Sequence, residues 1–333
     1  MFILETMSSY AVESCPDAEP FFYNQGFRGM LLYNVSIGLV GLLLNVLFAF
    51  RYYNNTLLPP AIRIIVSFYV LNYIVNTSLF AFIRGMHWVM YYSVTSPCHV
   101  LVDKTLCFYL NFTQTILQCQ PTFLHFAMAV DRLLSFNTKR FKRHFEWKLG
   151  VLHCLASFFL ALGAACIIFR KVVPSGRTAY CSAMTTANAS DALAVTAGII
   201  AIEIITIISS FSSYLFRRNT DKRRTYVMAL RYQQSENIYV FRLMLPWMVA
   251  HFILFTTFYG NGLIMTQIFS GTDFVKVLTL TGYMNLHPVY AVVLPILLTI
   301  IIRRQKNTRQ AAISELIGHD ASADSYFKAY GWM

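Results

Sequence analysis

Long apolar runs alternate with short polar stretches over most of the chain. Seven of these runs are long enough to cross the roughly 30 Å hydrocarbon core of a bilayer as helices. They cover residues 31–52, 61–83, 107–134, 149–169, 192–216, 243–269 and 278–302. We therefore expect an all-α, GPCR-like bundle of seven transmembrane helices over 31–302, preceded by an N-terminal segment over 1–30 and followed by a tail over 303–333.

The third run differs from the others because it carries polar residues at helical spacing. These residues are Asn111, Gln114, Gln118, Thr122, His125 and Arg132. They follow one another at intervals of three, four and seven, which places them on one face of a helix. Polar groups that face hydrocarbon are costly, so this face should point into the bundle. The third helix is therefore expected to be the central one.

Composition supports a membrane protein. Of the 333 residues, 56% are hydrophobic and only 13% are charged, and the mean hydropathy is +0.52. A soluble domain of this size carries about twice that share of charged residues. We therefore expect a multi-pass membrane protein with the lipid bilayer as a partner.

The basic residues indicate an orientation, because Lys and Arg concentrate in cytoplasmic loops. Most of the 27 Lys and Arg residues fall on one side of the expected bundle. The few on the other side are Arg28, Arg84, Lys104, Arg170, Lys171, Arg177 and Lys276. The N-terminus should thus lie outside and the C-terminus inside. The net charge of +12 then reflects topology and attraction to anionic lipid, and gives no reason to expect nucleic-acid binding.

Four cysteines fall on or near the outer side, where disulfides persist. Four cysteines allow three pairings. We favour Cys107 with Cys181, which ties the third helix to the loop before the fifth, and Cys15 with Cys98. The rival is a bond between Cys98 and Cys107, which are only nine residues apart.

Asparagines have two expected roles. Asn45 and Asn72 lie within predicted spans, where such side chains usually bridge helices. Asn188 heads the only Asn-x-Ser/Thr triplet expected to face outward, and is the candidate for glycosylation. Its closeness to the fifth span weakens that candidate.

Glu203 is the one carboxylate expected deep in the bilayer. Counting back from the basic residue at the inner end of each helix places Glu203, Gln118 and His287 about 21 to 24 Å from the inner boundary. We expect them to form a polar cluster at the floor of a ligand site, with Asn111 and Gln114 above it. The same count places His125 and His251 about 10 to 14 Å up, too low to join it. The alternative is that Glu203 forms a hydrogen bond between helices and does not contact the ligand.

Known catalytic patterns are missing from the sequence. It contains no His-x-x-Glu-His, no Gly-x-Ser-x-Gly and no phosphate-binding Gly-x-x-x-x-Gly-Lys motif. His125, His251 and His287 are single residues on different spans, so they are expected to be core residues. We therefore expect no enzyme, no metal site and no cofactor. The alternative is a channel or transporter. Such proteins often carry several charges deep in the membrane or an internal repeat, whereas this sequence has one deep charge and no visible repeat.

Three motifs carry a family resemblance. They are Pro97-Cys98 followed by Cys107, Asp131-Arg132 at the foot of the third helix, and Arg231-Tyr232-Gln233 with Glu236-Asn237 before the sixth. With these motifs the chain resembles the nematode serpentine chemoreceptors of the group that joins classes alpha, alpha-beta, beta and epsilon. The motifs leave the class within that group open, with a lean to epsilon or alpha.

The resemblance implies a G-protein-coupled receptor of the plasma membrane, including that of sensory cilia, which binds an environmental small molecule or peptide. A heterotrimeric G protein would then be the cytoplasmic partner. The residues expected to serve coupling are Asp131, Arg132, Arg140, Arg223, Arg224 and Glu236. Arg132 is expected to be the main signalling residue, held at rest by Asp131 and Glu236. The sequence departs from rhodopsin-like receptors, because Leu133 replaces the aromatic residue of their Asp-Arg-Tyr triplet.

Overall fold

A computed structural model describes residues 15–16, 18–52, 60–134, 146–182, 188–221, 242, 244–257, 274–285 and 287–318. This part of the chain is almost entirely helical. The helices are α1 (Glu19–Phe22), α2 (Gln25–Tyr52), α3 (Pro60–Ser93), α4 (Lys104–Leu134), α5 (Glu146–Phe169), α6 (Ala189–Asp221), α8 (Phe274–Tyr283) and α9 (His287–Gly318). A further helical stretch covers Met244–Thr257. The other elements are the 3-10 turn η1 (Pro97–Val100) and the strands β1 (Val102–Asp103) and β2 (Arg177–Thr178).

Five described stretches are long and apolar enough to cross a membrane. They lie in α2, α3, α5, α6 and, taken together, α8 and α9. Met244–Thr257 is apolar but shorter in the part that the structure describes. Helix α4 is long enough at 31 residues, but its polar stripe lowers its hydropathy.

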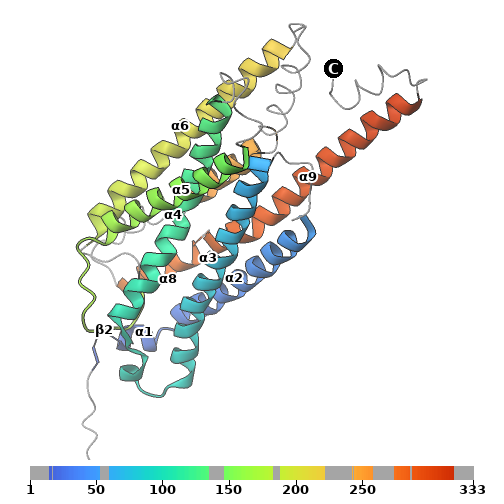
Figure 1. The fold of residues 1–333 in the computed structure, drawn as a ribbon. Coiled ribbons are helices and arrows are strands. Elements are labelled where there is room, and N and C mark those ends of the chain that lie inside the picture. Colours follow the sequence, from blue (N-terminus) through green and yellow to red (C-terminus); the bar gives the residue numbers. More distant parts are fainter. Residues whose placement is uncertain are drawn as a thin grey trace, which may run out of the picture.

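The long helices form one bundle (Figure 1). Helix α2 packs against α3 and α9, while α4 packs against α3, α5 and α6. Helix α1 and the paired strands β1 and β2 lie at one end, which we call the disulfide end. Helices α6 and α9 project at the opposite end (Figure 1), which we call the arginine end after Arg51 and Arg303. The third predicted helix is central, as expected.

The seventh predicted span is broken. Helix α8 ends at Tyr283, a turn follows at Met284, and α9 begins at His287. Pro288 lies in the first turn of α9, where a proline removes no hydrogen bond. Helix α9 then continues without interruption to Gly318. The tail expected from residue 303 therefore begins as part of the same helix, and the boundary of the membrane domain at residue 302 stays a prediction.

Buried asparagines join neighbouring helices, as the sequence predicts. The Asn45 side chain donates to the carbonyl oxygen of Ala291 at 2.7 Å and so links α2 to α9. Nearby, a Cβ at Gly41 would lie 2.9 Å from the Cβ of Ala291, so only glycine permits this approach. Asn72 donates to Gln120 and links α3 to α4.

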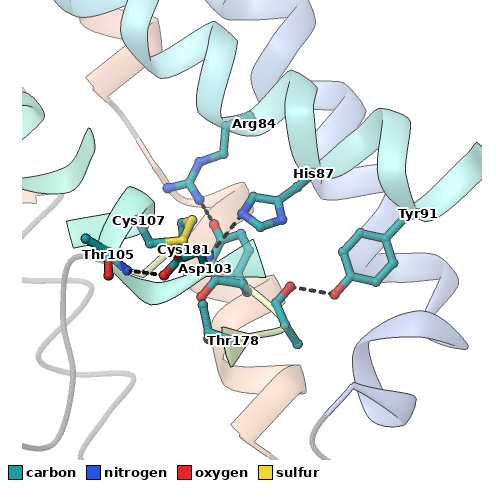
Figure 2. Close-up of a disulfide and its surroundings, with 10 residues drawn as sticks. Arg84, His87, Tyr91, Asp103, Thr105, Cys107, Thr178 and Cys181 are labelled. Carbon is teal, nitrogen blue, oxygen red and sulfur yellow. Dashed lines mark hydrogen bonds between the residues drawn. A yellow bond between two sulfur atoms is a disulfide. The ribbon is translucent and has the colours of Figure 1, made fainter. Parts of the chain in front are cut away.

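Both favoured disulfides are present at the disulfide end. Cys107 is bonded to Cys181, with 5.1 Å between their Cα atoms, and Cys15 is bonded to Cys98, with 5.4 Å between theirs. The rival bond between Cys98 and Cys107 is thereby excluded. The first disulfide joins α4 to the loop after β2, as Figure 2 shows.

Helix α3 holds the same loop by hydrogen bonds (Figure 2). The Tyr91 hydroxyl donates to the carbonyl oxygen of Ala179 at 2.8 Å. Nε2 of His87 accepts the N–H of Cys181 at 3.0 Å. Strands β1 and β2 pair antiparallel beside it. The loop between α5 and α6 is thus fixed to two helices by one covalent bond and several hydrogen bonds.

The expectation of a glycan at Asn188 does not fit the structure. The residue is 0% exposed, and its carbonyl oxygen accepts the N–H of Ala192 at the start of α6. A glycan needs an accessible side-chain amide. The position serves the beginning of the helix instead.

Candidate functional site

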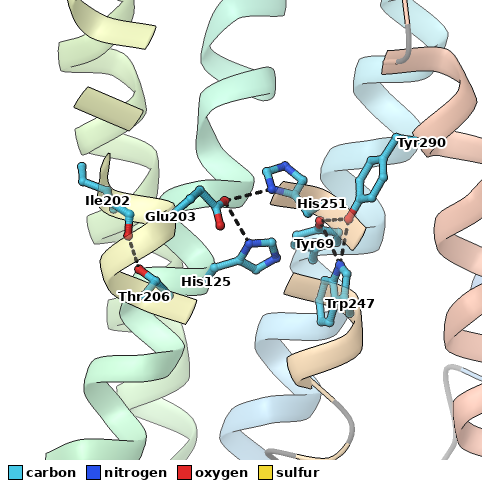
Figure 3. Close-up of polar contacts among 8 residues, drawn as sticks. All are labelled: Tyr69, His125, Ile202, Glu203, Thr206, Trp247, His251 and Tyr290. Atoms are coloured by element: carbon cyan, nitrogen blue, oxygen red, sulfur yellow. Dashed lines mark hydrogen bonds and ion pairs between the residues drawn. The ribbon is translucent and has the colours of Figure 1, made fainter. Parts of the chain in front are cut away.

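A carboxylate and two imidazoles meet in the middle of the bundle (Figure 3). Oε1 of Glu203 on α6 lies 3.2 Å from Nδ1 of His125 on α4. The same oxygen lies 2.9 Å from Nδ1 of His251, which belongs to Met244–Thr257. The exposed fractions are 0% for Glu203, 0% for His125 and 3% for His251. We call these three residues the Glu-His-His cluster.

Aromatic rings fix the two imidazoles in place. The His125 ring stacks on Tyr69, with 5.5 Å between centroids, and meets Trp247 edge-on. The His251 ring stacks on Phe255 and meets Tyr290 edge-on. Such contacts restrict both rings to one orientation. The cluster is therefore held by packing as well as by charge.

A second polar group adjoins the cluster (Figure 3). The hydroxyls of Tyr69 on α3 and Tyr290 on α9 lie 2.7 Å apart. Nε1 of Trp247 lies 3.0 Å from each of them and donates to both. We call these residues the Tyr-Trp-Tyr triad. Together with the cluster it connects α3, α4, α6, α9 and Met244–Thr257 through buried polar contacts.

Not all polar atoms of the cluster are satisfied. Within the described part of the chain, Oε2 of Glu203, Nε2 of His125 and Nδ1 of His251 have no hydrogen-bond partner. The His251 atom is close to Oε1 of Glu203, but the contact does not have hydrogen-bond geometry. Buried groups left in this way each cost about 1–3 kcal/mol. Such groups are therefore candidates for binding something further.

Glu203 has two partners that the depth count had excluded, and its predicted contact with His287 stays a prediction. The expectation that His125 and His251 lie too low is contradicted by their contacts with Glu203. In the described chain, no hydrogen bond joins Glu203 to Gln118, and the side chain of His287 lies outside the described residues.

The error comes from using Arg217 as the inner end of α6 when the depth of Glu203 was counted. Glu203 precedes Arg217 by twice as many residues as His125 precedes Arg132, although the cluster sets both at one level. Helix α6 runs on to Asp221 and projects beyond its neighbours (Figure 1). Arg217 therefore lies about 10 Å farther out along its helix than Arg132 does, at roughly 1.5 Å per residue.

The polar stripe of α4 points inward, as predicted. Asn111 is 3% exposed and Gln114 is 6% exposed, while Gln118 is half-buried. Among the described residues, none of these three side-chain amides makes a hydrogen bond. They lie between the disulfide end and the Glu-His-His cluster. This segment of α4 thus presents polar side chains to the interior of the bundle.

Of the residues expected to couple to a G protein, the structure places one side chain. Asp131 is buried, with 2% exposed, near the arginine end of α4. The side chain of Arg132 lies outside the described residues, as do Arg140, Arg223, Arg224 and Glu236. Their roles stay predictions.

Sequence reasoning missed the Tyr-Trp-Tyr triad. Tyr69, Trp247 and Tyr290 lie on three different helices, and no spacing along the chain links them. The partners of Glu203 did leave a signal, since a buried carboxylate needs a cationic or donor partner and few histidines lie within the spans. The count of depth along the helices excluded His125 and His251, which are the two histidines that contact Glu203.

The chain also matches known proteins in sequence. Residues 23–331 match the family described as serpentine type 7TM GPCR receptor class ab chemoreceptor. The match covers nearly the whole chain. The chain belongs to this family. A similar curated protein is serpentine receptor class beta-18 of Caenorhabditis elegans, which is 18% identical over 303 residues, covering 89% of this chain and 83% of that protein.

Membership of the class ab chemoreceptors confirms the expected group and the seven-helix fold. It corrects the preference for class epsilon or alpha. The family is one of multi-pass membrane receptors and is not an enzyme family. The Glu-His-His cluster, the Tyr-Trp-Tyr triad and the stripe of α4 thus form the interior of a serpentine receptor.

Proposed function

We propose that this serpentine receptor binds an environmental small molecule or peptide on the disulfide-end half of α4 and signals through a heterotrimeric G protein at the arginine end. Asn111, Gln114 and Gln118 are the proposed ligand contacts. The observation that supports the proposal is the row of inward-facing amides on the central helix, which make no hydrogen bond to another described residue. In a chemoreceptor such groups are available to a ligand that enters from the disulfide end.

The amides predict a ligand with hydrogen-bonding groups. A site built to bond a polar group discriminates strongly against analogues that lack it, because its own buried groups are then left unpaired. Expressing the receptor in cells with a calcium readout and screening odorant and peptide libraries would identify such a ligand. Asn111→Ala with Gln114→Ala should then weaken the response tenfold or more. Tyr109→Ala, on the exposed face of α4, is the matched control and should leave the response unchanged.

Arg132 is the proposed contact with the G protein. It follows the buried Asp131 near the end of α4, and an arginine stays charged in such a place. Arg132→Ala should abolish ligand-evoked signalling without loss of surface expression. Arg51→Ala, at the same end of α2, is the control and should signal normally. Unchanged signalling in Arg132→Ala would make this arginine an interfacial anchor only.

Glu236 is proposed to restrain Arg132 in the resting receptor. Removing its charge should free the arginine, so Glu236→Gln is expected to raise basal signalling. Arg140, Arg223 and Arg224 are proposed as further contacts, since basic loops can bind a signalling partner as well as lipid. Basal activity that stays at the wild-type level in Glu236→Gln would contradict the restraint.

The proposed location is the plasma membrane, including that of sensory cilia, with the N-terminus outside. The distribution of Lys and Arg supports that orientation. An N-terminal epitope tag should be accessible to antibody on intact cells, whereas a C-terminal tag should need permeabilised cells. A ligand-evoked current in oocytes without added G protein would favour a channel instead.

A further inference from the structure

We propose that Glu203, His125 and His251 bind a transition-metal ion of the zinc type in the middle of the bundle. The sequence alone predicted no metal site, because these three residues lie on different helices. The proposal concerns this cluster and does not depend on which ligand or G protein the receptor uses.

The chemistry of the three side chains suits zinc. Two imidazole nitrogens and one carboxylate oxygen are a known zinc ligand set, with the fourth position left for water or another ligand. Nitrogen-rich sets disfavour Mg²⁺ and Ca²⁺, which prefer oxygen ligands. The cluster therefore selects for the zinc group among common divalent ions.

The distances suit a small ion. One ligand atom from each residue lies within 4.8 Å of the others. With bonds of about 2.0–2.1 Å, ligand atoms in a tetrahedral site are about 3.3 Å apart. The separations from Oε1 of Glu203 are 3.2 Å to His125 and 2.9 Å to His251. The two imidazole nitrogens lie farther apart, at up to 4.8 Å, so they would have to approach each other by up to about 1.5 Å to hold the ion.

A hydrogen-bonded cluster alone leaves atoms unused. Both Nδ1 atoms approach the same carboxylate oxygen, yet only His125 meets it with hydrogen-bond geometry. Oε2 of Glu203 and Nδ1 of His251 have no hydrogen-bond partner in the described chain. An ion on the carboxylate and the two Nδ1 atoms would engage Nδ1 of His251 and offset the negative charge of the carboxylate, leaving one positive charge on the site.

The two histidines proposed to bind the metal ion are preorganised by their neighbours. The His125 ring is fixed by Tyr69 and Trp247, and the His251 ring by Phe255 and Tyr290. Ligands fixed by their neighbours bind a metal with little loss of conformational freedom. An ion here would join α4, α6 and Met244–Thr257, so binding should stabilise the bundle.

The test uses the purified full-length receptor in detergent, freed of metal with a chelator. Zinc chloride is then added, and bound zinc per chain is measured by elemental analysis of the protein after gel filtration. The wild type should bind one ion per chain, and its melting temperature should rise. Cobalt(II) in place of zinc should give the visible absorption of a tetrahedral nitrogen and oxygen site.

Three variants locate the ion. Glu203→Gln and His251→Gln should each weaken zinc binding tenfold or more and remove the cobalt spectrum. His99→Gln removes an exposed histidine of η1, and should bind zinc like the wild type. If Glu203→Gln fails to fold, His251→Gln and the cobalt spectrum of the wild type still decide.

Two results would overturn the proposal. One is a wild-type receptor that binds no stoichiometric zinc and gives no tetrahedral cobalt spectrum. The other is zinc binding that persists unchanged in Glu203→Gln and His251→Gln. Either result would leave the Glu-His-His cluster as a hydrogen-bonded ion pair only.

Discussion

The disulfide end and the Glu-His-His cluster both tie α4 to its neighbours, but by different means. At the disulfide end a covalent bond joins Cys107 to Cys181, and α3 adds hydrogen bonds from Tyr91 and His87. In the cluster, α4 is joined to α6 and to Met244–Thr257 by contacts of one carboxylate with two imidazoles and by ring contacts of His125, none of them covalent.

The disulfide end is therefore a fixed region, and the cluster is a region that can rearrange. A disulfide limits the separation of its two segments in every folded state, whereas the contacts of Glu203 can be exchanged for others without breaking a covalent bond. A receptor needs both properties, because a change at the ligand site must reach the opposite end. We expect movements to occur around the cluster while the disulfide end keeps its shape.

Removing the disulfide should have the largest effect on stability. The Cys107 and Cys181 positions are 74 residues apart, and a loop of that length corresponds to about 4 kcal/mol of lost chain entropy in the unfolded state. Cys107→Ser with Cys181→Ser should therefore lower the melting temperature and the surface expression strongly. Cys166→Ser removes an exposed free cysteine and should change neither. A double variant as stable as Cys166→Ser would show that the hydrogen bonds alone hold the loop.

Removing the indole donor of the Tyr-Trp-Tyr triad should have an intermediate effect. Trp247→Phe takes away the N–H that bonds to Tyr69 and Tyr290 and leaves a small cavity, which should cost about 1–3 kcal/mol. Trp147→Phe, at a 54% exposed position of α5, is the control. Melting curves of both variants in detergent would check the order. A Trp247→Phe receptor that melts with the control would mean that the triad adds nothing to stability.

Breaking an ion pair at the surface should have the smallest effect. Asp191 accepts hydrogen bonds from Arg170 at 2.8 and 3.0 Å, but the Arg170 side chain is 58% exposed. Water and salt screen such a pair. Asp191→Asn should lower the melting temperature slightly at low salt and not at all at high salt. A loss as large as that of Trp247→Phe, or one that persists in high salt, would show that this pair is more than a surface contact.

The sequence predicted correctly those features that leave a pattern along the chain. Hydrophobic runs predicted where most helices lie, and the inward face of α4 followed from the spacing of residues such as Asn111 and Gln114. The four outer cysteines allowed few pairings, and the favoured one, which ties the third helix to the loop before the fifth, is the one observed.

Other features depend on how far each helix is shifted along its axis. The partners of Glu203 could not be found by counting, because α6 extends past the level at which its neighbours end. The turn at Met284 and the continuation of α9 to Gly318 depend on packing between helices. Tyr69, Trp247 and Tyr290 come together only when three helices are placed at the correct height and rotation.

Because α6 projects beyond its neighbours, a small tilt of α6 at the Glu-His-His cluster would produce a larger displacement at the end of the helix. From Glu203 to Asp221 the helix spans 18 residues, which is about 27 Å at roughly 1.5 Å per residue. A tilt of about 5° around Glu203 would move the far end of α6 by roughly 2 Å for this arm length. A change of contacts at Glu203 that tilts α6 slightly would therefore displace the end of α6 by ångströms.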